Sequence, residues 1–351
     1  MLASVCSHYL LNEPPVWLFV IGPSSAGKTT QMIEPLNSLK LVRLLDVVND
    51  KTFVNGYEDK ASVVVNKKTN QKLSPNEGGL LFRLKGDDNG VKHGIFAFSD
   101  WSMFTSLKIE VRQNLQAQFR GIYDGHLSHE VGNNKTIKWD GKVTMIIAGT
   151  KETEFEMGNL SGLGDRFLKV RMNFVEGIDE RIAMFNKAAG NMGKKGGIKE
   201  NLEKMIYGLI EGDDFVKASA KVVDKHVNFP YLLEVASILR RSITRDKRNN
   251  KIVNIGETEN NTRIASGAIQ IARGSAMLVR QSEIGHTDMR LAMKTIIDNI
   301  PYDRWCLVRA LACTEDGVGT SFGFEHKLHG VFSSYAIELC IERVGILGFI
   351  Q

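Results

Sequence analysis

Short runs of consecutive apolar residues recur along the first half of the chain. Each run is too short for a helix and is bounded by Pro, Gly, Asp or Thr, which is typical of a strand buried on both faces of a sheet. The runs lie at residues 16–21, 94–99 and 142–149, and further strands are expected within 40–54 and 163–172. Helices are expected between them, over 2–11, 28–39, 78–85 and 109–123. This order of elements indicates an α/β fold.

A β-hairpin is predicted before the last two of these strands. Residues 127–131 and 136–139 form two short strand-like segments, and Gly-Asn-Asn at 132–134 lies between them. Lys135 then lies at the tip of the hairpin. A lone Lys at an exposed tip is usually only solvated, whereas a tip that enters the pore of a ring can grip nucleic-acid phosphates.

The pattern changes after residue 176, where strand-like runs stop and amphipathic helical segments dominate. Residues 190–197 are rich in Gly and Lys and are expected to form a loop. Helices are expected over 198–211, 213–222, 229–245, 260–280, 286–298, 303–313 and 329–345. We therefore predict a core at 1–175, a helical region at 176–300 and a small C-terminal domain at 301–351.

Composition is that of an ordinary globular protein, with 43% hydrophobic and 24% charged residues among 351. The four cysteines have no metal-ligand spacing, and they indicate a reducing compartment. The apolar run at 16–21 is too short to span a bilayer, and no charged leader precedes it, so a cytoplasmic protein without a membrane partner is expected. The net charge of +5 permits nucleic-acid binding without requiring it, and where the charge lies matters more than its sum.

The segment that follows the first strand matches the pattern G-x-x-x-x-G-K-[ST] in full. Its backbone N–H groups and the next helix N-terminus favour bound phosphates, so ATP is the expected ligand. Lys28 is expected to reach the β- and γ-phosphates, and Thr29 to ligate Mg²⁺. The expected nucleotide-binding residues of this loop are Gly22, Pro23, Ser24, Ser25, Ala26, Gly27, Lys28, Thr29 and Thr30.

Two polar residues that close later strands are candidates for the same site. Asp100 ends the strand at 95–98, and a carboxylate there lies at the same sheet edge as the loop, where it can hold Mg²⁺ or simply cap the strand end. Many ATPases place a water-activating Glu next, but this chain has Trp101, so the base is open between Glu110 and a group from elsewhere. Thr150 ends the next strand and can orient the attacking water or start a turn.

A candidate arginine finger precedes the last core strand. Arg166 lies in the segment Gly-Asp-Arg-Phe at 164–167, from which an Arg can reach the nucleotide of a neighbouring subunit and stabilise transition-state charge. The alternative is a structural Arg paired with Asp165 or another acid. The spacing alone does not decide between them.

Taken together, these segments resemble the AAA+ ATPases of the replicative-helicase kind, most closely the MCM-like helicases of phages and mobile genetic elements. The resemblance covers about residues 15–300 and is strongest within 15–172. It is carried by residues 22–30, 106–125, 139–143 and 163–168, and by 261–264 with 272–276.

This resemblance implies a P-loop AAA+ core with a parallel sheet and an inserted β-hairpin, followed by a helical lid and a winged-helix-like domain at 301–351. It further implies a ring, expected to be a hexamer, that couples ATP hydrolysis to movement along DNA as a helicase. Lys135 would grip single-stranded DNA in the central pore, and Arg263 would act as a second sensor of the nucleotide.

Three features depart from that family. Trp101 stands where Glu is expected, the chain begins about fifteen residues before the first strand and lacks an N-terminal collar, and any wing at its end is short. An ATPase that acts as a loader or remodelling switch without unwinding is therefore the alternative. A nucleotide or small-molecule kinase is a third interpretation, but it explains neither the hairpin nor Arg166.

Overall fold

The computed structural model describes residues 1–10, 13–24, 26–55, 79–87, 90–131, 135–158, 163, 166–172, 178–212, 228–246, 248, 251–258, 260–312 and 333–348. By its internal packing the chain divides into two compact units. The first comprises Met1–Lys221 and Arg273–Glu283, and the second comprises Val222–Ala272 and Ile284–Gln351. The domain boundaries expected at 175 and 300 stay predictions.

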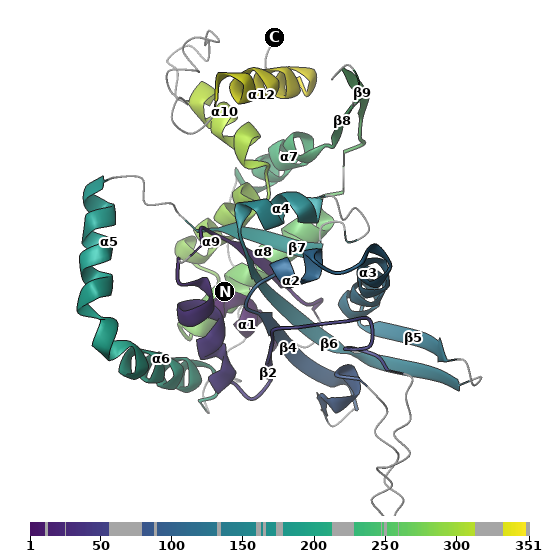
Figure 1. Ribbon diagram of the computed structural model, residues 1–351, viewed down its shortest axis with the longest axis vertical. Helices are drawn as coiled ribbons and strands as arrows, with labels where there is room; N and C mark the ends of the chain where they lie inside the picture. The colour runs from purple at the N-terminus through teal and green to yellow at the C-terminus, as the bar shows by residue number, and fades with distance from the viewer. Residues whose placement is uncertain are drawn as a thin grey trace, which may run out of the picture. The chain divides into compact units, whose positions relative to one another are not determined.

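A mostly parallel sheet of seven strands is the frame of the first unit (Figure 1). The parallel strands follow the order β2 (Val42–Leu45), β4 (Lys92–Phe98), β6 (Lys135–Gly149), β1 (Trp17–Ile21) and β7 (Phe167–Arg171). Two antiparallel strands complete it: β3 (Lys85–Gly86) pairs with β4, and β5 (His126–Val131) pairs with β6. The predicted α/β fold is confirmed at this level.

The central strands are continuously apolar because helices cover both faces of the sheet. Every residue of β1 is buried. On one face Trp17 and Phe19 pack with α3 (Ile109–Tyr123) and α2 (Ser102–Thr105). On the other face Val20 packs with α1 (Leu2–Ser7) and α6 (Lys195–Ile210). The periodicity that predicts a helix over 109–123 reflects this packing, since Leu115, Phe119 and Ile122 of α3 are buried.

Some expected elements have different forms. The helix expected over 28–39 is a π-helix, η1 (Lys28–Ile33), followed by a 3₁₀-helix, η2 (Glu34–Ser38). Pro35 within it has no N–H to donate, so a regular α-helical ladder cannot continue there. The helix expected over 78–85 is wrong, because the described part holds only the 3₁₀ turn η3 (Leu81–Arg83) before β3.

The predicted hairpin is present as β5 and β6, but β6 is longer than expected. One strand of 15 residues replaces the two segments expected at 136–139 and 142–149. Its first part pairs with β5, and its second part lies between β1 and β4 in the central sheet. The hairpin is therefore an extension of a core strand. Turn residues 132–134 lie outside the described residues.

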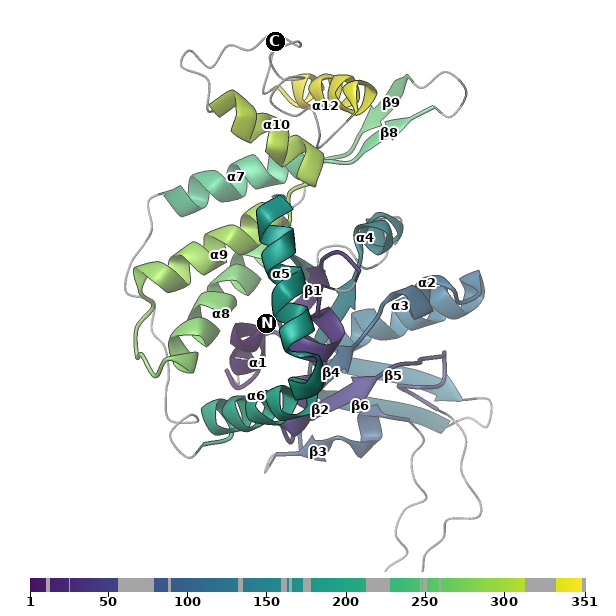
Figure 2. The same cartoon turned by 60° about the vertical axis from the view of Figure 1, so that its left-hand side comes forward.

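Two helices follow the sheet in the first unit, and they meet within residues 190–197, where a Gly- and Lys-rich loop was expected. The helix α5 (Ile178–Gly190) leads through the 3₁₀ turn η5 (Met192–Lys194) into α6 (Figure 2). Helix α4 (Lys151–Gly158) comes earlier, after β6. Each helical Gly lacks side-chain packing and disfavours a helix by about 1 kcal/mol, which is why composition predicts a loop at 190–197.

The second unit is mainly helical, but it also contains a hairpin. The helix expected over 229–245 ends at Arg240, and two strands follow it, so the expectation that strands stop after 176 is wrong. Its elements are α7 (Asn228–Arg240), β8 (Ile243–Arg245), β9 (Ile252–Ile255), α9 (His286–Asp298), α10 (Tyr302–Ala312) and α12 (Ser334–Ile346). Helix α8 (Thr262–Leu278) begins in the second unit and ends in the first. Across the described residues, every helix is too short or too polar to cross a bilayer.

Candidate functional site

The loop at 22–29 leaves the sheet at the end of β1 and is fixed there by its backbone. The Gly22 N–H donates to the carbonyl of Gly149 at the end of β6, over 3.2 Å. Gly27 has a φ of 78°, in the left-handed region that favours glycine, and η1 begins with the next residue. Strand, turn and helix thus follow one another as the motif requires. Ser25 lies outside the described residues.

Lys28 is buried and lies back over its own loop. Its Nζ donates to the carbonyls of Gly22, at 2.7 Å, and Pro23, at 2.6 Å. Burial lowers the pKa of the Lys28 ammonium, and the carboxylate of Asp100 opposes that shift. The loop lysine and the acid at the end of β4 are therefore electrostatic neighbours.

A hydrogen bond joins the loop to the end of β4. The Thr29 hydroxyl donates to the carbonyl of Ser99 over 3.2 Å, one residue before Asp100. The exposed carboxylate of Asp100 accepts from the N–H and hydroxyl of Ser102, at 2.9 and 2.8 Å, and so caps α2. Each carboxylate oxygen retains a further lone pair, so capping does not exclude a metal role. The metal role stays a prediction.

Packing explains why Trp101 replaces the expected Glu. Its indole is fully buried and stacks on Phe104, with ring centroids 4.4 Å apart, so this position belongs to the core. Glu110 is exposed in the first turn of α3. Asp46, which sequence reasoning missed, accepts from the Ser99 hydroxyl over 2.8 Å. Asp46 directly follows β2, and Asp100 follows β4 after Ser99. This shared position of an acid after a strand is the signal in the sequence that could have identified Asp46.

Strand register brings Thr150 to the same edge. Gly149 lies opposite Ile21 of β1, and β6 separates β1 from β4, so Thr150 follows the strand between the loop and Asp100. Its hydroxyl lies 3.2 Å from that of Thr153 at the start of α4. A hydrogen bond from Thr150 also lowers the pKa of the exposed Glu152 carboxyl. These contacts are those of a turn-starting Thr, and the water-orienting role stays a prediction.

A pocket of about 1000 Å³ opens beside the loop and η1. Its second wall comes from α5 and α6, including the apolar side chains of Phe185, Ile198 and Leu202. An ion pair of 2.8 Å between Lys199 of α6 and Glu34 of η2 holds that wall to the loop helix. The pocket therefore combines backbone N–H groups at one end with apolar side chains at the other.

Arg166 lies at the other edge of the sheet from the loop. Trp17, the first residue of β1, pairs with Phe167, so Arg166 precedes the strand while the loop follows Ile21. The buried Arg166 guanidinium donates to the carbonyl of Leu163 and to Asp124, at 3.1 and 3.3 Å. It lies away from the loop of its own chain, so a catalytic role for Arg166 would have to be in a neighbouring subunit. Asp124 is the acid that the structural alternative requires.

Two other candidates belong to other parts of the chain. Lys135 begins β6 and its backbone pairs with Val131, but its side chain lies outside the described residues. Arg263 is exposed on α8 in the second unit. Within the described residues, no three His, Cys, Asp or Glu side chains are grouped closely enough to hold a metal ion by themselves.

Comparison with known proteins adds no relative. No protein-family model matches the chain, and no curated protein matches it in sequence. Function is therefore argued from the site alone.

Proposed function

We propose that the protein is an ATP hydrolase and that the loop at 22–29 is its phosphate-binding loop. The observation that carries this proposal is the hydrogen bond from Thr29 to Ser99. It ties the motif's hydroxyl to the strand end that bears Asp100, 70 residues later in the chain. Hydroxyl and carboxylate oxygens are ligands that suit Mg²⁺, which usually takes one or two carboxylates together with nucleotide phosphates.

In this proposal each residue of the edge has a separate task. The nucleotide phosphates replace the carbonyls of Gly22 and Pro23 as partners of Lys28, while Thr29 and Asp100 hold Mg²⁺. Mg²⁺ held there would neutralise part of the negative charge of the nucleotide phosphates. Thr150 orients the attacking water, and the base is one of the exposed acids of the edge, Asp46 or Glu110. The apolar wall of α5 and α6 covers the base of the nucleotide.

We further propose that the chain is an AAA+ ATPase of the MCM-like kind, which acts as a DNA helicase or translocase in a hexameric ring. The hairpin of β5 and β6 supports this, because it extends from β6, the strand that Thr150 directly follows. A movement at the sheet edge that binds the nucleotide can then be transmitted to Lys135 along β6. Arg166 would act on a neighbour's ATP, and the helices from 228 onward would supply the lid with Arg263 and the winged-helix-like segment at 301–351.

Three measurements test this function. ATP turnover should be stimulated by single-stranded DNA, the oligomeric mass should rise to that of a ring with ATP, and a forked duplex should be unwound. Lys135→Ala should keep basal turnover and lose stimulation. Turnover with DNA stimulation but without unwinding would favour the loader or switch, and absence of ATP turnover would refute the proposal.

A further inference from the structure

The net positive charge of the chain is concentrated in one short segment of the second unit. Residues 240–251 contain six of the chain's 45 Lys and Arg and one of its 40 Asp and Glu. The other 339 residues therefore hold 39 of each sign and are neutral overall. The formal charge of +5 is a property of this segment, and a localised charge of that kind attracts a polyanion.

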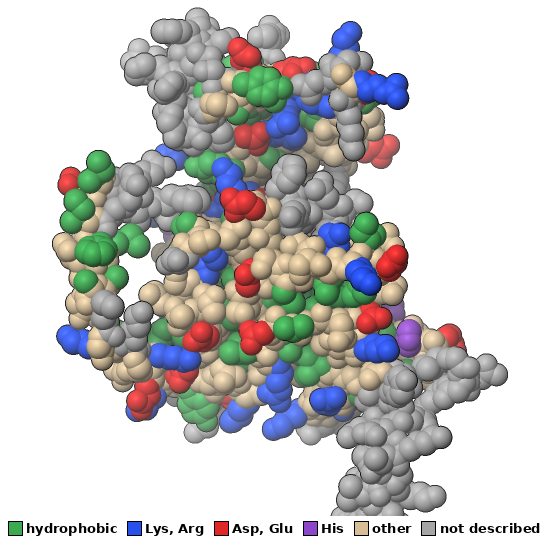
Figure 3. All heavy atoms as spheres, in the orientation of Figure 1, with side chains coloured by type: hydrophobic (Ala, Val, Ile, Leu, Met, Phe, Trp, Pro, Cys, Tyr) green, Lys and Arg blue, Asp and Glu red, His purple; other side chains and the backbone are tan. Residues whose placement is uncertain are grey.

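The described part of this segment belongs to the hairpin of β8 and β9, and we call residues 240–246, 248 and 251–256 the basic hairpin. Thr244 pairs with Asn254, and a bulge follows between Thr244 and Arg245. At its base the Arg241 Nε donates to the carbonyl of Gly256 over 2.8 Å. Figure 3 shows Lys and Arg side chains gathered at this hairpin.

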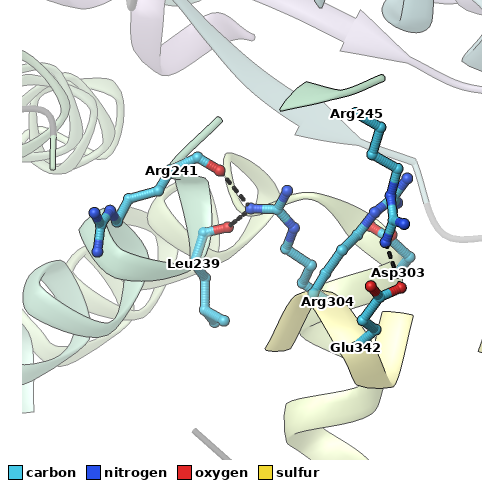
Figure 4. A network of polar contacts seen from close by, with 7 residues as sticks. Leu239, Arg241, Arg245, Asp303, Arg304 and Glu342 are labelled. Atoms are coloured by element: carbon cyan, nitrogen blue, oxygen red, sulfur yellow. Dashed lines mark hydrogen bonds and ion pairs between the residues drawn. The ribbon is translucent and has the colours of Figure 1, made fainter. Parts of the chain in front are cut away.

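Two other contacts fix the hairpin to the helices of its unit (Figure 4). Near the turn, Arg245 at the end of β8 pairs with Glu342 of α12 at 2.6 Å. At the base, Arg304 of α10 donates to the carbonyl of Arg241 over 2.8 Å. Part of the basic charge is thus used to hold the hairpin in place, and the turn beyond Arg245 is considered next.

In the turn, Arg248 and Lys251 are exposed, and the one acid of the segment, Asp246, forms hydrogen bonds within the turn. Asp246 accepts from the N–H of Arg248 over 2.9 Å, and its own N–H donates to the carbonyl of Lys251 over 2.9 Å. The acid therefore orders the turn, and the turn presents positive charge outward.

We propose that the basic hairpin binds duplex DNA by entering its major groove. A two-stranded β-ribbon fits that groove, and Arg248 and Lys251 at its end lie where they can contact phosphates. A lipid surface is disfavoured because residues 240–256 contain no Phe, Trp or Tyr to anchor in the interface. Duplex RNA is disfavoured because the major groove of its A-form helix is too narrow.

This site is separate from the proposed ATPase and from Lys135. It requires no nucleotide and no ring pore, and it would hold duplex while another part of the protein acts on a single strand. Sequence reasoning missed it because residues 240–245 were assigned to the end of a helix, although the charge density of the segment was visible in the sequence.

The test measures duplex DNA affinity of the full chain against salt concentration, without nucleotide. Each phosphate contact contributes about 0.9 to the slope of log K against log salt concentration. The double variant Arg248→Ala with Lys251→Ala should therefore lower the slope by at least about 1.8 and weaken binding at low salt. The control, Arg290→Ala with Lys204→Ala, removes two exposed charges elsewhere and should leave the slope unchanged.

Three outcomes would overturn the proposal: no duplex binding by the wild type, an unchanged slope in the double variant, or equal losses in the double variant and its control. A loss confined to single-stranded DNA, or to vesicles of anionic phospholipid, would assign the hairpin to that partner instead. Repeating the series with Lys28→Ala separates this site from the ATPase, because DNA binding here should persist without ATP turnover.

Discussion

Lys28, at the start of η1, and Lys142, in β6, are two buried lysines of the first unit with similar immediate contacts. Their exposed fractions are 9% and 7%. Each donates to a backbone carbonyl over 2.6 Å, Lys28 to Pro23 and Lys142 to Leu10. Burial lowers the pKa of both, and that of Lys142 to about 8. A buried lysine with carbonyl partners therefore does not by itself define a functional site.

Their surroundings distinguish them. Lys28 lies beside a pocket and has Asp100 as its electrostatic neighbour. Lys142 lies near the start of the core part of β6, close to the buried His8. Lys28 can exchange its carbonyls for a ligand without unfolding anything, whereas Lys142 is held by the segment that precedes β1. We therefore expect activity to depend on Lys28 and stability on Lys142.

The largest effect is expected for Lys28→Ala. Removing a cation preorganised toward the transferring phosphoryl group should lower ATP turnover by at least about 10³-fold. Thermal unfolding should change little, because Pro23 is exposed and its carbonyl can bind water in place of Lys28. Measured turnover near wild type would remove the functional distinction between the two lysines.

Arg166→Ala tests whether a buried cation at the far edge also serves catalysis. If Arg166 is an arginine finger, turnover should fall by about 10³-fold. The control is Asp124→Asn, which breaks the ion pair and keeps Arg166. Mixed with Lys28→Ala subunits, the Arg166→Ala protein should regain turnover that neither has alone. Equal, small effects of both substitutions would make Arg166 structural, like Lys142.

Asp100→Asn tests whether the neighbouring carboxylate is what distinguishes Lys28 from Lys142 in function. The amide oxygen can still accept from Ser102, so the cap on α2 is largely kept while the charge is lost. Turnover should fall by about 10²-fold, the size of one preorganised electrostatic group. Asp46→Asn is the comparison at the neighbouring strand end, where it also tests the proposed role of Asp46 as base. A larger loss for Asp46 would transfer the metal role to it.

Local patterns predicted the strands and helix α3 well. The spacing of apolar residues at 111, 115, 119 and 122 defines α3 because those side chains meet one core. The helix expected over 229–245 failed because Ile243 and Thr244, β-branched residues suited to strands, were assigned by continuity with the helix before them. Tertiary pairing with β9 decided their conformation.

For the site, the loop and the residues at the strand ends could be predicted from the sequence, but the contacts between them could not. The partners Thr29 and Ser99 are 70 residues apart, and no spacing rule links them. The motif around Arg166 was equally compatible with a finger and with an ion pair, because its partner Asp124 lies 42 residues earlier. The sequence shows that Trp101 stands where Glu was expected, but only its packing on Phe104 in the structure explains why.

For Lys142 no effect on turnover is expected, only a change in the pH dependence of stability. Its pKa is about 8 in the folded protein and 10.5 as its ordinary value, so the unfolded chain holds more protons between those values. The contribution of Lys142 to the free energy of unfolding should therefore rise from pH 8 to 10.5, by up to about 3 kcal/mol. The buried thiols of Cys6 and Cys340, whose pKa burial raises to about 12, act in the opposite direction above pH 9 in wild type and variants alike. Lys142→Met should flatten that rise, whereas Lys138→Met, exposed on the same strand, should keep it. Denaturant titrations across this range measure it, and identical pH profiles for wild type and Lys142→Met would show that Lys142 carries no burial penalty.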